Sequence, residues 1–448
     1  MRTKWLLGVV LAALLVALGR ETTLAVPRPS WNFAWIESLL PADPLSVVAE
    51  LDQQFTVGPT IAGGEFIDPR ESRATLEAPL LVWLTHVAAL RDGYLDEEDV
   101  TRYWEQDKEA MADRLTFLVW LKAPVREYAD LRSESSRSRA FLVDDAGRRF
   151  EQAPESLPDL GESPESEVVL NRLEFPLTDA EGKRIITSLT KHIDLCVVSD
   201  LGEARFRFKF PAEELASEQD LRRWMTYYYG EPRPELLVPA VKLLAATGAL
   251  DKPTAVAPLA TFLGQVFRQN PEKLSAWVEE LGGLRSDHQK VLWRALWSAG
   301  IPEATALLQA IADEAAGENR GYLANLLQQT PPDLLTMAID SPAALDMLWA
   351  AFLATGDGKY VARIIEVLPW AAQTADQPKF YLGAAARWSL TSNALQHQRV
   401  LESCVEQAAH QPEEGKAALE EIIRNVREER SRRLKERPQV EYKEEQAF

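Results

Sequence analysis

The feature that most constrains the fold is a change in apolar patterning near Ser217. Before this point, short apolar runs separated by Asp and Gly predict β-strands; after it, apolar residues recur every three or four positions between Gly, Pro and Asn, as in helices. A chain of 448 residues also exceeds the usual size of a single hydrophobic core. We therefore predict a multidomain α+β protein, with a β-rich domain over 26–216 and an all-α domain over 217–436.

The clearest strand of the first domain is 205–210, where Phe206, Phe208 and Phe210 alternate with basic residues. This alternation predicts one buried face and one basic, solvent-facing face. Further strands are expected at 115–121, 141–143, 148–150, 168–175 and 193–199, and Asp144 to Gly147 is a turn of the kind that joins paired strands. These features indicate an antiparallel, sandwich-like domain. A helical segment is expected near 77–111, and the Pro- and aromatic-rich residues 26–44 are expected to form an extended lead-in.

An internal repeat appears in the second domain. Leu292-Trp293 stands at the same distance before Gly300 as Leu348-Trp349 before Gly356, and Gly248 ends a similar segment. Glycine in a left-handed conformation stops a helix and lets the chain fold back. Apolar-periodic partners follow the last two copies, at 304–311 and 360–368. A stack of helical hairpins is predicted, closed by a helix from 413 to 436, with 437–448 as a loose tail.

At the level of the fold, this C-terminal half resembles the α-solenoid class that includes HEAT-like and tetratricopeptide-like repeats. No copy matches the full residue pattern of a named repeat, so no binding positions follow from the resemblance. It implies a helical-repeat surface with a concave face for another protein.

The N-terminus carries the pattern of a secretory signal. Arg2 and Lys4 precede an apolar run from Trp5 to Gly19, and small residues follow near 23–25. We expect residues 1–25 to be a signal peptide and the protein to be exported to the periplasm or the extracellular space. An uncleaved membrane anchor is the alternative, although the run is shorter than the ~20 residues that span a bilayer. A membrane contact is expected only in that case.

The net charge and the sequence motifs limit the classes of function that this chain can have. A formal charge of −19, from 49 Lys and Arg against 68 Asp and Glu, repels phosphate backbones and argues against a nucleic-acid partner. The sequence holds no GxSxG, Walker or GxGxxG motif, and its five histidines form no metal-binding pair. Asp92 to Asp99 resembles the second half of a calcium loop, but Ala88 and Leu90 replace the earliest ligands, so we expect Asp96 to cap a helix instead. No cofactor or metal is predicted, and Cys196 and Cys404 are expected to be buried thiols.

The only candidate binding residues are the aromatic cluster of Trp224, Tyr227, Tyr228 and Tyr229, at the point where the strand-rich half meets the helices. Such rings stack on a sugar or peptide, or they pack between domains. We expect a non-catalytic interaction or scaffold protein of the cell envelope that binds a protein partner. The alternative is a periplasmic or secreted hydrolase that acts on a glycan or peptide in the groove between the domains.

Overall fold

The computed structural model describes residues 29–435, apart from Ala42, Glu65, 132–135, 153–167, Lys183, 188–189, 211–214, Ala216 and the side chain of Ala34. These residues form two compact units: a β-containing unit of 29–210 with 431–435, and a helical unit of 215–430. The predicted signal peptide, 1–25, and the predicted loose tail, 437–448, lie outside the described residues.

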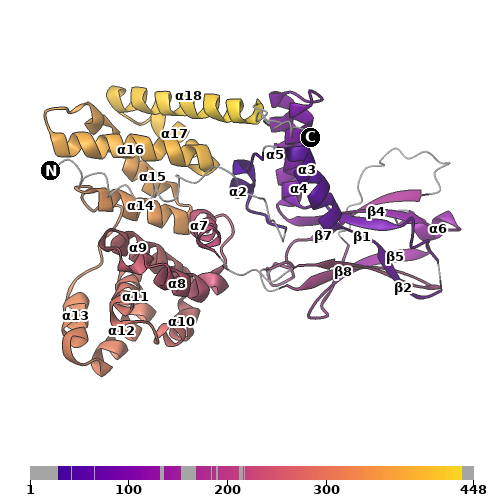
Figure 1. Ribbon diagram of the computed structural model, residues 1–448, viewed down its shortest axis with the longest axis horizontal. Helices are drawn as coiled ribbons and strands as arrows, with labels where there is room; N and C mark the ends of the chain where they lie inside the picture. The colour runs from indigo at the N-terminus through magenta and orange to yellow at the C-terminus, as the bar shows by residue number, and fades with distance from the viewer. Residues whose placement is uncertain are drawn as a thin grey trace, which may run out of the picture. The chain divides into compact units, whose positions relative to one another are not determined.

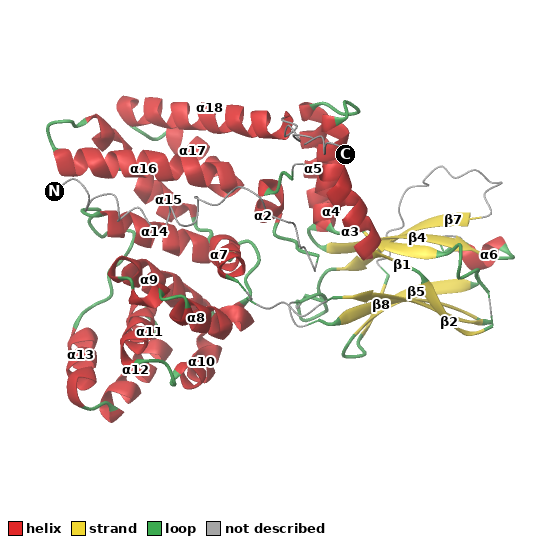
Figure 2. Cartoon of the chain, in the orientation of Figure 1, coloured by secondary structure: helices red, strands yellow, loops and turns green. Residues whose placement is uncertain are grey.

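The β-containing unit holds two antiparallel sheets (Figures 1 and 2). The first has the order β1-β3-β4-β7 and consists of β1 (Thr56–Val57), β3 (Arg73–Leu76), β4 (Arg114–Lys122) and β7 (Val168–Pro176). The second has the order β2-β9-β8-β5-β6 and consists of β2 (Pro59–Gly63), β9 (Gly202–Lys209), β8 (His192–Ser199), β5 (Ser138–Asp144) and β6 (Arg149–Glu151). The antiparallel strands expected from β4 onward are confirmed. The short β1, β2 and β3 were not expected.

Alternating apolar side chains build the core of this unit. In β9, Phe206 and Phe208 are buried, as the alternation predicted. The ring of Phe208 lies 5.2 Å from that of Phe117 in β4, which belongs to the other sheet, and Phe117 in turn contacts Phe175 of β7. Large aromatic rings of both sheets therefore share one buried cluster.

The opposite face of β9 is exposed and basic, as the alternation predicted, because Arg205, Arg207 and Lys209 are all exposed. Asp194 of the neighbouring strand β8 lies opposite Arg207 in the ladder and is only 2% exposed. Arg207 donates two hydrogen bonds of 2.8 Å to the two carboxylate oxygens of Asp194. Arg205 bonds to Glu203 and also reaches Asp194. A buried carboxylate needs such charged donors, so two arginines of this exposed face also satisfy a buried carboxylate of the sheet.

Helices of the β-containing unit are α2 (Phe33–Ser38), α3 (Pro44–Phe55), α4 (Pro79–Arg91), α5 (Glu97–Met111) and the short α6 (Arg126–Ala129). The helical segment expected near 77–111 is confirmed, and the Asp96 carboxylate caps α5 by accepting from the backbone N–H of Asp99 at 2.8 Å. The extended lead-in over 26–44 is wrong in part, because Asn32 accepts from the N–H of Trp35 and so begins α2 between the prolines.

The helical unit contains no strand in its described residues. Its helices are α7 (Glu218–Tyr227), α8 (Leu237–Ala246), α9 (Pro253–Gln269), α10 (Leu274–Leu281), α11 (Ser286–Ala299), α12 (Pro302–Glu314), α13 (Gly317–Gln328), α14 (Pro342–Thr355), α15 (Gly358–Ile365), α16 (Gln377–Gln396), α17 (Gln398–Ala408) and α18 (Glu413–Lys435). Short 3-10 helices cover η1 (Pro234–Leu236), η2 (Ala249–Asp251), η3 (Pro271–Lys273) and η4 (Leu368–Ala372).

The glycines expected to stop helices do so. Gly300 ends α11 with φ +61°, Gly356 ends α14 with φ +67°, and Gly248 follows α8 with φ +72°. All three adopt the left-handed conformation, and the helices α12 and α15 follow the later two.

Helix α9 lies at the centre of the helical unit, where it packs against both α11 and α14 (Figure 1). The α9–α11 contact is close because Gly264 has no side chain: a β-carbon there would lie 2.9 Å from the carbonyl oxygen of Ala295. Beside it, the Ser298 hydroxyl of α11 donates to the carbonyl oxygen of Ala260 at 2.9 Å. Because α9 and α11 pack closely at these residues, only their remaining faces can line a cavity.

Candidate functional site

The predicted aromatic residues fall into two groups. Trp224 and Tyr228 are buried and form edge-to-face contacts with each other and with Phe262 of α9, at centroid distances of 5.3 to 5.7 Å. The indole N–H of Trp224 donates to the carbonyl oxygen of Arg233 at 3.1 Å. This pair joins α7 to α9.

Tyr227 and Tyr229 are partly buried and surround His397 instead, with ring centroids 5.1 and 5.7 Å from the imidazole. The Tyr229 hydroxyl and His397 Nδ1 share a hydrogen bond of 3.1 Å. His397 is fully buried, and burial lowers its pKa to about 3, so the imidazole is neutral at pH 7. These contacts place all four aromatic residues in the packing of the helical unit.

A cavity of about 170 Å³ lies elsewhere in the helical unit. Its wall is formed by one face of α9, one face of α11, single residues of α14 and α15, and the segment 332–335 between α13 and α14. The lining side chains that carry polar groups or aromatic rings are Thr261, Gln265, Arg268, Arg294, Trp297, Ser298, Asp333 and Tyr360. A cavity of roughly 150 Å³ accommodates a benzene ring, so this one has room for a single amino-acid side chain.

Helical periodicity brings the polar side chains together. On α9, Thr261, Gln265 and Arg268 recur every three or four residues and share one face; on α11, Arg294 and Trp297 do the same. The close α9–α11 pairing at Gly264 sets these two faces side by side. The cavity therefore follows directly from how these helices pack.

The charges at the cavity are unbalanced. Arg268 donates its Nε–H to the carbonyl oxygen of Ala299 at 2.7 Å, but within the described chain neither Arg268 nor Arg294 forms an ion pair. Asp333 is the one acidic residue of the lining, and its carboxylate accepts hydrogen bonds of 3.0 Å from the N–H of Leu335 and the hydroxyl of Thr336. The lining therefore carries two positive charges against one negative charge that its own loop already uses.

Two neutral polar groups complete the lining. Gln265 is only 5% exposed, and its side-chain amide makes no hydrogen bond to any residue that the structure describes. Tyr360 is buried, which raises the pKa of its hydroxyl, so this group stays protonated at neutral pH. Both groups can donate a hydrogen bond to a molecule in the cavity.

No protein-family model, curated protein or solved structure matches this chain. The chemistry of its cavity is therefore the basis for assigning a function.

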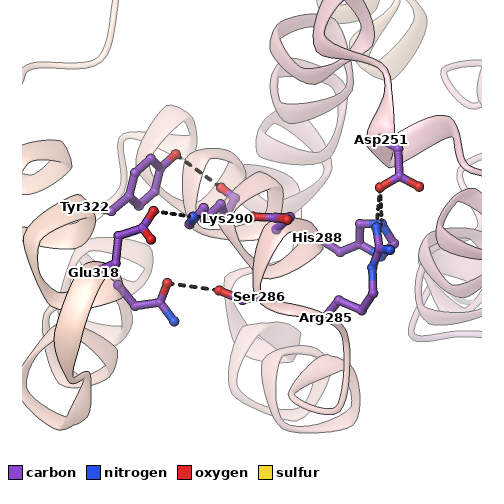
Figure 3. A network of polar contacts seen from close by, with 9 residues as sticks. Asp251, Arg285, Ser286, His288, Lys290, Glu318 and Tyr322 are labelled. Carbon is purple, nitrogen blue, oxygen red and sulfur yellow. Dashed lines mark hydrogen bonds and ion pairs between the residues drawn. The ribbon is translucent and has the colours of Figure 1, made fainter.

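A second polar cluster lies around the start of α11 (Figure 3). His288 Nε2 lies 3.0 Å from an Asp251 carboxylate oxygen, and Arg285 contacts both side chains. The hydrogen bond with His288, helped by Arg285, holds the pKa of Asp251 below its usual range. Further along α11, Lys290 pairs with Glu318 of α13 at 3.1 Å. These contacts join η2, α11 and α13, and none of the five residues lines the cavity.

The described residues include no group of three or more His, Cys, Asp or Glu side chains placed to hold a metal ion. Cys196 and Cys404 are both buried free thiols, as expected, and burial raises the pKa of each to about 12. A neutral, buried thiol behaves as a small apolar side chain.

One carboxyl group of the helical unit has an unusual environment. Asp346 of α14 is partly buried, and burial raises its pKa to about 7. No charged neighbour contributes to this shift.

Sequence reasoning missed the cavity because its walls come from residues about a hundred positions apart. One signal was present in the repeat: Arg294 stands where the next copy has Ala350, and Ser298 stands where it has Ala354. Polar residues that stand on one helix face in only one copy of the repeat indicate that this copy has a role that the other copy lacks.

Proposed function

We propose that this chain is a non-catalytic interaction or scaffold protein that holds a protein partner in the cavity of its helical unit. The observation that carries the proposal is the cavity itself. Its size suits one side chain, and its lining offers two arginines and one glutamine amide that have no ion-pair or hydrogen-bonding side-chain partner among the described residues. Recognition of a protruding side chain by a pocket in a rigid helical surface is a common mode of protein binding.

The proposal includes a finer architecture. We take the helical unit to be an α-solenoid of helical hairpins, because α11 with α12 and α14 with α15 repeat the same glycine-stopped arrangement. We take the two sheets to be a β-sandwich, because Phe117 and Phe208 bring both sheets into one aromatic cluster.

Localisation to the periplasm or the extracellular space is also part of the proposal. Its support is the signal-like composition of residues 1–25, which lie outside the described residues. Within the described ranges, no helix combines the length and apolar character needed to cross a membrane.

The competing proposal is a hydrolase acting on a glycan or peptide, which requires two carboxyl groups with separated pKa values. Asp346 has a pKa near neutrality, as a general acid does. However, burial alone causes the shift, and no second titratable group influences this carboxyl. Asp346 is therefore better described as an isolated, partly buried carboxyl group than as one half of a catalytic pair.

Site-specific photo-crosslinking tests the interaction proposal. A photoreactive amino acid replaces Leu335 at the cavity, and the same substitution at exposed Val405 of α17 and at exposed Tyr94 provides controls in each unit. We expect a discrete protein adduct from position 335 that is absent from positions 405 and 94. Equal adduct patterns at all three positions, or none at position 335, would contradict the proposal.

A further inference from the structure

We propose that the cavity selects a partner segment through one carboxylate side chain, an Asp or Glu, set among neutral or basic residues. This inference rests on the proposed function and names the chemistry that the site recognises. It depends on the lining charges, the unpartnered amide and the charge of the whole chain.

The first observation is the uncompensated positive charge. The chain carries a net charge of −19, yet Arg268 and Arg294 face the same cavity with no carboxylate partner among the described residues. Both side chains are exposed, so they are free to pair with an anionic group of a ligand in the cavity. Guanidinium groups are well suited to a carboxylate because they offer parallel N–H donors.

The second observation is Gln265, which lies on the same face of α9 as Arg268. The residue is only 5% exposed, and its amide keeps contact with solvent and bonds to no described residue. An N–H of this amide can donate to a carboxylate oxygen, and so can the hydroxyl of Tyr360. The cavity thus presents charged donors and neutral donors to the same small volume.

The charge count favours a carboxylate over a phosphate group. Arg268, Arg294 and Asp333 give the lining a net charge of +1, which a single carboxylate neutralises. A phosphate dianion would give the lining a net negative charge, and it would stand near the Asp333 carboxylate.

The whole-chain charge restricts the rest of the segment. A field from −19 charges repels a run of acidic residues before it reaches the cavity. The partner segment therefore carries one acidic side chain rather than an acidic stretch. Apolar residues of the lining, such as Leu334 and Met347, suit the methylene groups of that side chain.

The test uses the full chain and a random twelve-residue peptide library displayed on phage. The tightest peptide is synthesised together with its isosteric amide version, in which Glu becomes Gln or Asp becomes Asn. Binding constants of both peptides are measured by fluorescence anisotropy. We expect the acidic peptide to bind at least tenfold more tightly, because a hydrogen bond to a charged group typically contributes about 1.5 to 3 kcal/mol and 1.4 kcal/mol corresponds to tenfold.

Variants of the chain test whether the cavity causes this difference in peptide affinity. Arg294→Gln is the principal variant, since this side chain is exposed and forms no hydrogen bond or ion pair with any described residue. It should reduce the preference for the acidic peptide to less than about twofold, and Arg294→Lys should restore part of it. Arg320→Gln, at an exposed position of α13 away from the cavity, should leave the preference unchanged. Gln265→Leu should weaken the acidic peptide about three- to tenfold.

Several results would overturn the inference. The acidic and amide peptides would bind equally, or Arg294→Gln would behave like Arg320→Gln. Competition by millimolar inorganic phosphate that abolishes peptide binding would assign the site to phosphate instead. A protein adduct at position 335 without any carboxylate preference would sink this inference but leave the proposed function intact. Absence of both peptide binding and an adduct would contradict both.

Discussion

At the residue scale, the helical unit holds two titratable side chains in surroundings that disfavour their charged forms. His397 is fully buried beside Tyr227 and Tyr229, and its pKa falls to about 3. Asp346 is partly buried, and its pKa rises to about 7. Desolvation is the main cause in both cases, and it acts in opposite directions on a base and an acid.

Replacement of Asp346 by Asn should stabilise the protein, and more so at high pH. The pKa of Asp346 rises from 3.8 to about 7 on folding, so this carboxyl favours the folded state below pH 3.8, and that contribution is lost as the pH rises through 7. The difference corresponds to at most about 4 kcal/mol, since each pKa unit is 1.36 kcal/mol. Urea unfolding at pH 4.5 and 8.5 measures it.

The Asp346→Asn variant should therefore gain more free energy of unfolding at pH 8.5 than at pH 4.5. Asp340→Asn, at an exposed position, controls for the loss of one negative charge. Equal gains at the two pH values would show that the Asp346 carboxyl is not desolvated.

Single residues also show where sequence reasoning reaches its limit. Trp224 and Tyr228 were visible as aromatic residues, but only the fold shows that they pack on Phe262. Arg268 and Arg294 look like ordinary surface arginines in the sequence. Their meaning depends on the lack of an ion-pair partner among the described residues, which is a property of the folded chain.

At the element scale, the contact between α9 and α11 positions the two polar faces of the cavity. Gly264→Ala should loosen it, because the added methyl group meets the backbone of α11 at Ala295 and displaces the Ser298 hydroxyl. Overpacking of this kind typically costs about 1 to 3 kcal/mol. Thermal unfolding of the full chain measures the loss.

The matched control is Gly321→Ala in α13, where a β-carbon meets no atom within 4 Å. There, alanine should stabilise the helix by up to about 1 kcal/mol, because glycine has the greater backbone entropy to lose. Similar effects of the two substitutions would show that α9 and α11 do not approach closely at Gly264.

Elements with strong local signals were predictable, and those defined by their neighbours were not. The pattern of Gly300 and Gly356 predicted two helix ends, and both glycines adopt the left-handed conformation. Strands β1 to β3 have two to five residues, and β2 contains both Pro59 and Gly63, so pairing with other strands defines them. Helix α2 was hidden among prolines because a single Asn32 cap starts it.

At the scale of the whole molecule, the net charge of the chain and the net charge of the cavity lining have opposite signs. The chain has a formal charge of −19, whereas the cavity lining has a net charge of +1. This contrast favours partners that present one carboxylate locally without a strongly acidic surface. The central claim is that this cavity in the helical unit is where a protein partner binds.

Hydrogen–deuterium exchange of the full chain, with and without the tightest library peptide, tests this claim most directly. The segment 331–340 is informative because it lines the cavity, contains no described helix or strand and has largely exposed side chains. We expect slower amide exchange in 331–340 and at the cavity-facing ends of α9 and α11 when the peptide is bound. Protection confined to the sheets of the β-containing unit, with 331–340 unchanged, would contradict it.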